Sequence, residues 1–116
     1  MITRTAIFEG RIKPGCEAAF KRGFHEQLVP LWRQFPHAGN IRLMWGGGTD
    51  DALRPVALLQ QIDYPSHEAL AEAIASPARA QARAITLELM AMFEGRLYHV
   101  VSNSNDITSD GTPPGN

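Results

Sequence analysis

The chain contains four histidines, the side chains best suited to carry protons near neutral pH. His99 lies in an extended segment and His25 at the margin of a helical apolar stripe, whereas His37 and His67 lie in a loop and at a helix start. Their spacing does not match that of paired metal ligands, so we expect no metal site. His99, first, and His25, second, are the candidate catalytic bases. For each, the alternative is a structural or solvated histidine.

Other chemically interesting residues have simpler interpretations. The three glycines at 46–48 lack the Gly-Lys-Ser/Thr ending of a phosphate loop and do not lead into a helix, so a flexible hairpin is expected. The carboxylates at 50–51 fall in the same loop and are expected to be solvated. Cys16 is the only cysteine, which excludes an internal disulfide and fits a reducing compartment. Arg79 and Arg83 lie four apart on a predicted helix and are interpreted as its wet face.

Adjacent glutamines interrupt an apolar extended segment. Gln60 and Gln61 must point to opposite faces of a strand, and a buried amide needs hydrogen-bond partners. One of them is expected at the bottom of an aromatic-lined pocket, and the pattern leaves open which; a purely structural hydrogen bond is the alternative. The candidate substrate-binding residues are Phe8, Phe20, Phe24, Trp45 and Gln61.

Two amphipathic segments are predicted to be helical. The first follows the turn at 13–15 and is interrupted at Pro30, which lacks a backbone N–H. The second begins after Ser66 as the N-cap and restarts at 76–77, where Ser precedes Pro at the first helical position. Gly95 is expected to close it.

The predicted strands and helices alternate in an order that defines the fold class. The strands are 3–12, 41–46, 55–63 and 96–102, giving the order βαββαβ. Right-handed crossovers place the first and third strands in the middle of a four-stranded antiparallel sheet, with both helices on one face. The prediction is therefore an α+β, ferredoxin-like domain over residues 1–103. A polar tail at 104–116 is expected to be disordered.

The third strand is apolar at consecutive positions. Residues 56–59 read Val-Ala-Leu-Leu, so both faces of this strand need cover, and the chain has no third layer to supply it. A second copy of the chain packed sheet against sheet is the expected partner. The net charge of -1 does not favour nucleic acid, and no apolar run is long enough to span a membrane. We expect a cytoplasmic homodimer.

Three segments carry a resemblance to a known superfamily. Residues 8–20 (FEGRIKPGCEAAF), 58–83 (LLQQIDYPSHEALAEAIASPARAQAR) and 93–101 (FEGRLYHVV) resemble the dimeric α/β-barrel proteins. The similarity is greatest to the antibiotic-biosynthesis-monooxygenase-like and EthD-like branches. The resemblance implies a ligand pocket between the helices and the sheet, with the opposite face of the sheet forming the dimer.

The resemblance also implies an activity. We expect a protein similar to cofactor-independent monooxygenases, with no metal or organic cofactor, acting on a small, hydrophobic and aromatic ligand. A non-catalytic ligand-binding or stress-related homodimer is the alternative. Haem degradation is not expected, because Phe8, Ala73 and the segment 79–84 stand where that branch carries its Asn, Trp and His.

Overall fold

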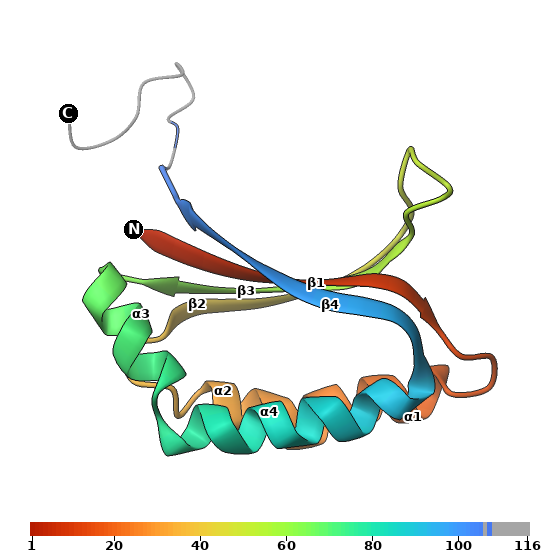
Figure 1. The fold of residues 1–116 in the computed structure, drawn as a ribbon, viewed down its shortest axis with the longest axis horizontal. Coiled ribbons are helices and arrows are strands. Elements are labelled where there is room, and N and C mark those ends of the chain that lie inside the picture. Colours follow the sequence, from red (N-terminus) through yellow and green to blue (C-terminus); the bar gives the residue numbers. More distant parts are fainter. Residues whose placement is uncertain (106, 108–116) are drawn as a thin grey trace.

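The described part of the chain forms one four-stranded sheet. Its helical segments all lie on one side of this sheet (Figure 1). The computed structural model describes residues 1–105 and 107. The strands are β1 (Ile2–Ile12), β2 (Gly39–Trp45), β3 (Val56–Tyr64) and β4 (Phe93–Asn103). The helical segments are α1 (Glu17–Gly23), η1 (Phe24–Leu28), α2 (Val29–Trp32), α3 (His67–Ile74), α4 (Pro77–Leu89) and η2 (Met90–Met92).

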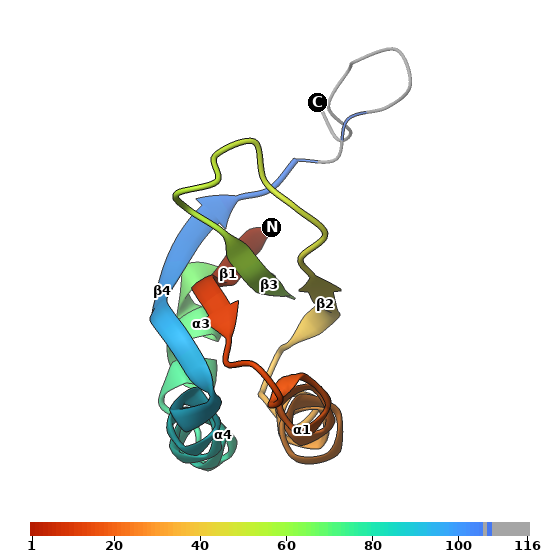
Figure 2. The ribbon, with the colours of Figure 1, turned by 90° about the vertical axis from the view of Figure 1, so that its right-hand side faces the viewer.

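The predicted topology is confirmed. The strand order is β2-β3-β1-β4 with all neighbours antiparallel, so the first and third strands occupy the centre. Seen end-on, α1 and α4 lie next to each other beneath one face of the sheet, and no helix described here covers the other face (Figure 2). No helix among the described residues is long and apolar enough to cross a membrane.

The first helical segment is not regular. α1 passes into η1, a π-helical turn, and α2 then begins with Pro30 in its first turn. Proline has no N–H to donate to the preceding turn, and the widened turn before it accommodates that missing bond. The interruption expected at Pro30 is therefore present, although it begins earlier, at Phe24.

The second helical segment ends earlier than expected. Its predicted break is present, since Ser76 caps α4 by accepting a hydrogen bond from the backbone N–H of Arg79 at 3.2 Å. The prediction that Gly95 closes the helix is wrong, because β4 already begins at Phe93. Gly95 instead pairs with Gly10 across β1 and β4, and both have a positive φ, of 147° and 142°.

A single apolar core fills the space between the sheet and the helices. Phe20, Phe24, Leu28 and Leu58 are completely buried at its centre. Phe8 meets Phe24 edge-to-face with ring centroids 5.4 Å apart. Phe20 and Phe24 lie closer still, at 4.8 Å. This aromatic cluster fixes the spacing between α1 and the central strands.

The helix-free side of the sheet, called here the open face, carries apolar side chains. Cross-strand register places Ile7 beside both Leu59 and Tyr98, and Thr5 beside both Gln61 and Val100. Tyr98 and Val100 are 38% and 43% exposed, which is high for residues of this kind in a sheet. The open face comprises Thr5, Ile7, Met44, Leu59, Gln61, Tyr98 and Val100.

The end of β4 stays attached to the start of β1. The backbone N–H of Ser104 donates to the carbonyl of Met1 at 2.8 Å, and the hydroxyls of Ser104 and Thr3 are hydrogen-bonded. Ser104 thus still contacts the sheet, one residue beyond the domain boundary expected from the sequence. Most of the expected tail, residues 106 and 108–116, lies outside the described residues.

Candidate functional site

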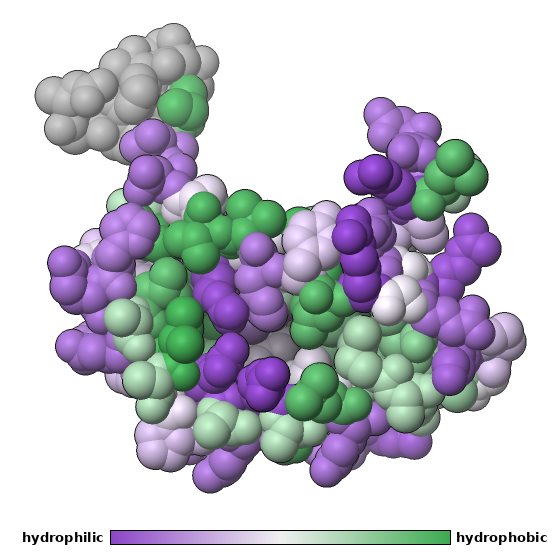
Figure 3. Space-filling view, viewed as in Figure 1, coloured by the Kyte–Doolittle hydropathy of each residue, from purple (hydrophilic) through white to green (hydrophobic). Residues whose placement is uncertain are grey.

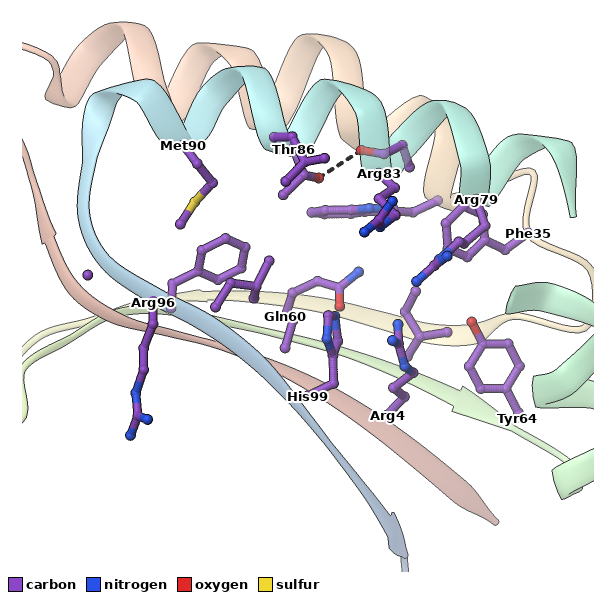
Figure 4. A pocket seen from close by; sticks show the side chains of 18 residues that line it. Arg4, Phe35, Gln60, Tyr64, Arg79, Arg83, Thr86, Met90, Arg96 and His99 are labelled. Atoms are coloured by element: carbon purple, nitrogen blue, oxygen red, sulfur yellow. Dashed lines mark hydrogen bonds between the residues drawn. The ribbon is translucent and has the colours of Figure 1, made fainter. Parts of the chain in front are cut away.

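A cavity of about 560 Å³ lies between the sheet and α4 (Figure 4). Its volume is within the range of roughly 300–1,000 Å³ that is usual for small-molecule sites. In the space-filling view, hydrophilic residues surround a hollow between the sheet and the helices, with apolar residues on either side (Figure 3). The lining includes Arg4, Ala6, Phe8, Gln60, Ile62, Tyr64, Arg79, Arg83, Thr86, Met90, Leu97 and His99.

Strand alternation positions the floor of the cavity. Ala6 is opposite Gln60 on β3 and opposite His99 on β4, so these three residues form a row across the sheet. Arg4 and Phe8 flank Ala6 on the same face of β1, because side chains two apart on a strand point the same way. The floor therefore changes along β1 from charged at Arg4 to aromatic at Phe8.

Helical periodicity positions the roof. Arg79, Arg83, Thr86 and Met90 are spaced by three and four, which brings them to one side of α4 and its extension. In Figure 4 their side chains descend toward Gln60, His99 and Arg4. The Thr86 hydroxyl donates to the carbonyl of Ala82 at 2.8 Å, so its proton is already engaged within the helix. The arginines are the polar groups of the roof that are free to meet a ligand.

The charges around His99 disfavour its protonation. Burial, followed by the positive charges of Arg4 and Arg79, lowers the pKa of His99 from 6.5 to about 4, even though part of the residue is exposed at the edge strand. Burial and Arg79 also lower the pKa of Arg4. Burial raises the pKa of the Tyr64 phenol, with Arg4 acting in the opposite direction. At neutral pH the site holds a neutral imidazole, a neutral phenol and cationic guanidiniums.

We expect the His99 imidazole to titrate near pH 4, well below the 6.5 of an ordinary histidine. The folded state then binds this proton less tightly than the unfolded chain. Acidification from 6.5 to about 4 should accordingly lower the free energy of unfolding. NMR titration of the four histidines measures the pKa values directly. Arg79→Gln should raise the pKa of His99, while a value near 6.5 in the wild type would contradict this electrostatic assignment.

The candidate residues named from the sequence fall into two groups. His99 and Phe8 line the cavity. Phe20 and Phe24 do not line it, because they are fully buried in the core behind Phe8. Trp45 lies outside the cavity as well, 5.8 Å from the ring of Phe24.

His25 and Gln61 are also outside the cavity. His25 is exposed on η1, with its ring 6.1 Å from that of Trp45. Gln60 is the glutamine that faces the cavity. Gln61 is on the open face, where its amide donates to the Thr5 hydroxyl at 3.2 Å.

The cavity residues that the sequence did not predict include two arginines of α4, Arg79 and Arg83. Arg83 is exposed, as expected of a wet helix face, but Arg79 is half-buried, and both line the cavity. Arg4 and Tyr64 were not predicted to line it either. Strand alternation was the signal for both, because Arg4 shares a face with Phe8, and Tyr64 shares one with Gln60.

Among residues 1–105 and 107, no cluster of three His, Cys, Asp or Glu side chains is arranged to hold a metal ion. The cavity instead offers arginines, a phenol, an amide and an imidazole around an apolar interior. Such a set can bind an anionic oxygen, accept a proton at His99 and enclose an aromatic body.

The fold is similar to those of several solved structures. For an EthD family protein from Bacillus halodurans the TM-score is 0.67 at 19% identity, covering 90% of this chain and 98% of the other. For SnoaB, a cofactor-independent oxygenase from Streptomyces nogalater, the TM-score is 0.65 at 16% identity, covering 93% and 96%. An antibiotic biosynthesis monooxygenase gives 0.61 at 19%, covering 90% and 98%.

These comparisons concern the fold. No family model matches the chain, and no curated protein matches it. At such low identities the likeness establishes architecture rather than activity. It confirms, at the level of the fold, the expected resemblance to the antibiotic-biosynthesis-monooxygenase and EthD structures.

Proposed function

We propose that this protein, which has the fold of the EthD and antibiotic biosynthesis monooxygenase structures, is a cofactor-independent oxygenase for a hydrophobic, aromatic substrate. The observation that carries the proposal is the cavity of about 560 Å³ in which the neutral His99 stands beside two arginines. SnoaB, whose fold is similar, is a cofactor-independent oxygenase, and this similarity supports the reaction class. Phe8, Leu97 and Met90 supply apolar contacts for an aromatic body.

His99 is proposed as the base. An imidazole with a pKa of about 4 is unprotonated at neutral pH and can accept a proton, but it is a weak base. The substrate must therefore be a strong carbon or phenol acid. The anion formed would lie near Arg4 and Arg79, whose positive charges stabilise it and offset the cost of charging His99.

The reaction can be written without a cofactor. Once His99 removes a proton from a CH₂ group between two aromatic rings, the carbanion can pass an electron to O₂ and combine with the resulting superoxide. The peroxide anion takes the proton back from His99, and the resulting hydroperoxide loses water to leave a ketone. One oxygen atom of O₂ enters the product and the other leaves as water, so R₂CH₂ and O₂ give R₂C=O and H₂O. The four electrons that reduce O₂ all come from the substrate.

The test is oxygen uptake by metal-stripped protein with anthrone as substrate. His99→Gln should reduce kcat/KM by about 100-fold or more, the usual range for losing a general base. His67→Gln changes an exposed histidine at the start of α3 and should have no effect. Catalytic turnover that survives the combined change of His99 and His25 to alanine would contradict the assignment of a histidine base.

A non-catalytic ligand-binding protein is the second candidate. It is favoured by one feature of His99: within residues 1–105 and 107, no side-chain hydrogen bond orients its imidazole. A general base is usually held by such a partner. If a broad panel of aromatic carbon acids binds in the cavity without oxygen uptake, this alternative is the better description.

The assembly proposed for either function is a homodimer. The apolar side chains of the open face are not packed against the core of their own subunit. Its two polar side chains are paired with each other, since the Gln61 amide donates to the Thr5 hydroxyl at 3.2 Å. A mainly apolar face whose polar side chains already have partners can be buried against a second copy at little cost.

A further inference from the structure

The cavity lining is strongly cationic. Among the residues that the structure describes, it includes Arg4, Arg79, Arg83 and Arg96 but no aspartate or glutamate. Arg96 is neutralised outside the cavity, because its Nε donates to Glu9 Oε2 at 2.6 Å. Its side chain points away from the other lining residues in Figure 4. The remaining three arginines make no ion pair with any residue of 1–105 or 107.

Arg4 and Arg79 approach the cavity from opposite walls. Arg4 rises from β1 and Arg79 descends from α4, and both are half-buried. They are close enough for the charge of Arg79 to lower the pKa of Arg4. Holding two like charges together in a partly desolvated site is unfavourable unless an anion lies between them. Tyr64 lines the same end of the cavity, and its phenol, neutral at physiological pH, can donate a further hydrogen bond.

The opposite end of the cavity is apolar. Phe8, Leu97 and Met90 line it. Phe8 and Leu97 are paired across β1 and β4, on the side of the row formed by Ala6, Gln60 and His99 that lies away from Arg4. A ligand that satisfies both ends must have a flat hydrophobic part and, at one edge, an anionic oxygen group. A carboxylate fits the cationic end because its two oxygens can accept paired hydrogen bonds from the N–H groups of a guanidinium.

We propose that the cavity selects aromatic carboxylates, with the carboxylate bound between Arg4 and Arg79 and the ring seated toward Phe8. The exposed Arg83 stands at the entrance and attracts the anion. This inference rests on the proposed function for the location of the substrate site. It does not require turnover, so it holds for an enzyme and for a binding protein alike.

Binding of 2-naphthoate and 2-naphthamide to the full chain tests the inference, because the two compounds have nearly the same shape and differ in charge. By isothermal titration calorimetry at low salt, the wild type should bind the acid at least about tenfold more tightly than the amide. Arg79→Gln should remove most of this preference while leaving the affinity for the amide nearly unchanged. Arg79→Lys should restore part of the preference for the acid, since the lysine ammonium keeps the positive charge but lacks the paired N–H groups of the guanidinium.

The control is Arg22→Gln, which removes an exposed arginine of α1 outside the cavity and should preserve the preference. Equal affinities of the wild type for the two compounds would overturn the inference. So would binding of neither at millimolar concentration, or a preference that survives Arg79→Gln. These outcomes are independent of oxygen uptake: anthrone turnover without any preference for the acid would overturn this inference and leave the proposed function standing.

Discussion

Leu59→Asp should convert the proposed dimer to a monomer. Leu59 is on the open face beside Ile7 and Met44, at the centre of the surface proposed to bind a second copy. In a two-fold assembly each substitution appears on both subunits, so two carboxylates would be buried without partners. Burying an unpaired charge costs several kcal/mol, enough to dissociate a dimer of micromolar affinity. In the monomer the new carboxylate faces water, so the fold itself should persist.

Sedimentation velocity at micromolar concentration measures this effect, with circular dichroism to verify folding. Leu53→Asp is the matched control, because Leu53 is 93% exposed in the loop between β2 and β3 and should tolerate the same chemical change. A folded Leu59→Asp protein that keeps the dimer mass would contradict an interface through the open face. A wild type with monomer mass would contradict the dimer altogether.

The fold could be predicted because its signals are local. Alternation along β1 and the apolar run of β3 indicate strands, and Ser66 and Ser76 cap α3 and α4 with their own hydroxyls, as the sequence indicated. The topology then follows from the order of elements and the handedness of crossovers. Gly95 was misassigned because a glycine at a helix end and a glycine at a close strand contact look alike in sequence. Only the pairing of Gly95 with Gly10 in the structure distinguishes the strand contact from a helix end.

The cavity could be predicted only in part. Because side chains alternate along a strand, Arg4 and Phe8 share a face, so the sequence contains the information that a cationic residue lies in the cavity floor. The sequence does not predict the orientation of Arg79 and Arg83, because these residues border the apolar stripe of α4. Whether such a residue faces solvent or a cavity depends on how far the helix stands from the sheet. The stripe likewise predicted that Phe24 is buried, but not that it fills core space rather than bounding a ligand site.

The contact between Gly10 and Gly95 holds β1 and β4 close together near the start of β4. The two residues are opposite each other, each with φ near 145°, in a region that other residues rarely adopt. A Cβ on Gly95 would lie 2.1 Å from the carbonyl oxygen of Glu9 and 2.8 Å from the Cα of Gly10. Gly95 also lines the cavity. The close approach of the two backbones therefore holds this part of the cavity wall in place.

Gly95→Ala should therefore destabilise the protein by about 3 kcal/mol or more, because an unfavourable φ and a clash with rigid backbone add together. Neither can be relieved by a side-chain rotation, since both atoms that the new methyl meets belong to the main chain. Gly47→Ala is the matched control, because no atom of the described residues lies within 4 Å of a Cβ built at Gly47. The free energy of unfolding of this variant should be nearly that of the wild type. Urea unfolding of both variants gives the two free energies. A Gly95→Ala protein as stable as the Gly47→Ala control would mean that β1 and β4 can separate at this point, which would contradict a rigid contact between Gly10 and Gly95.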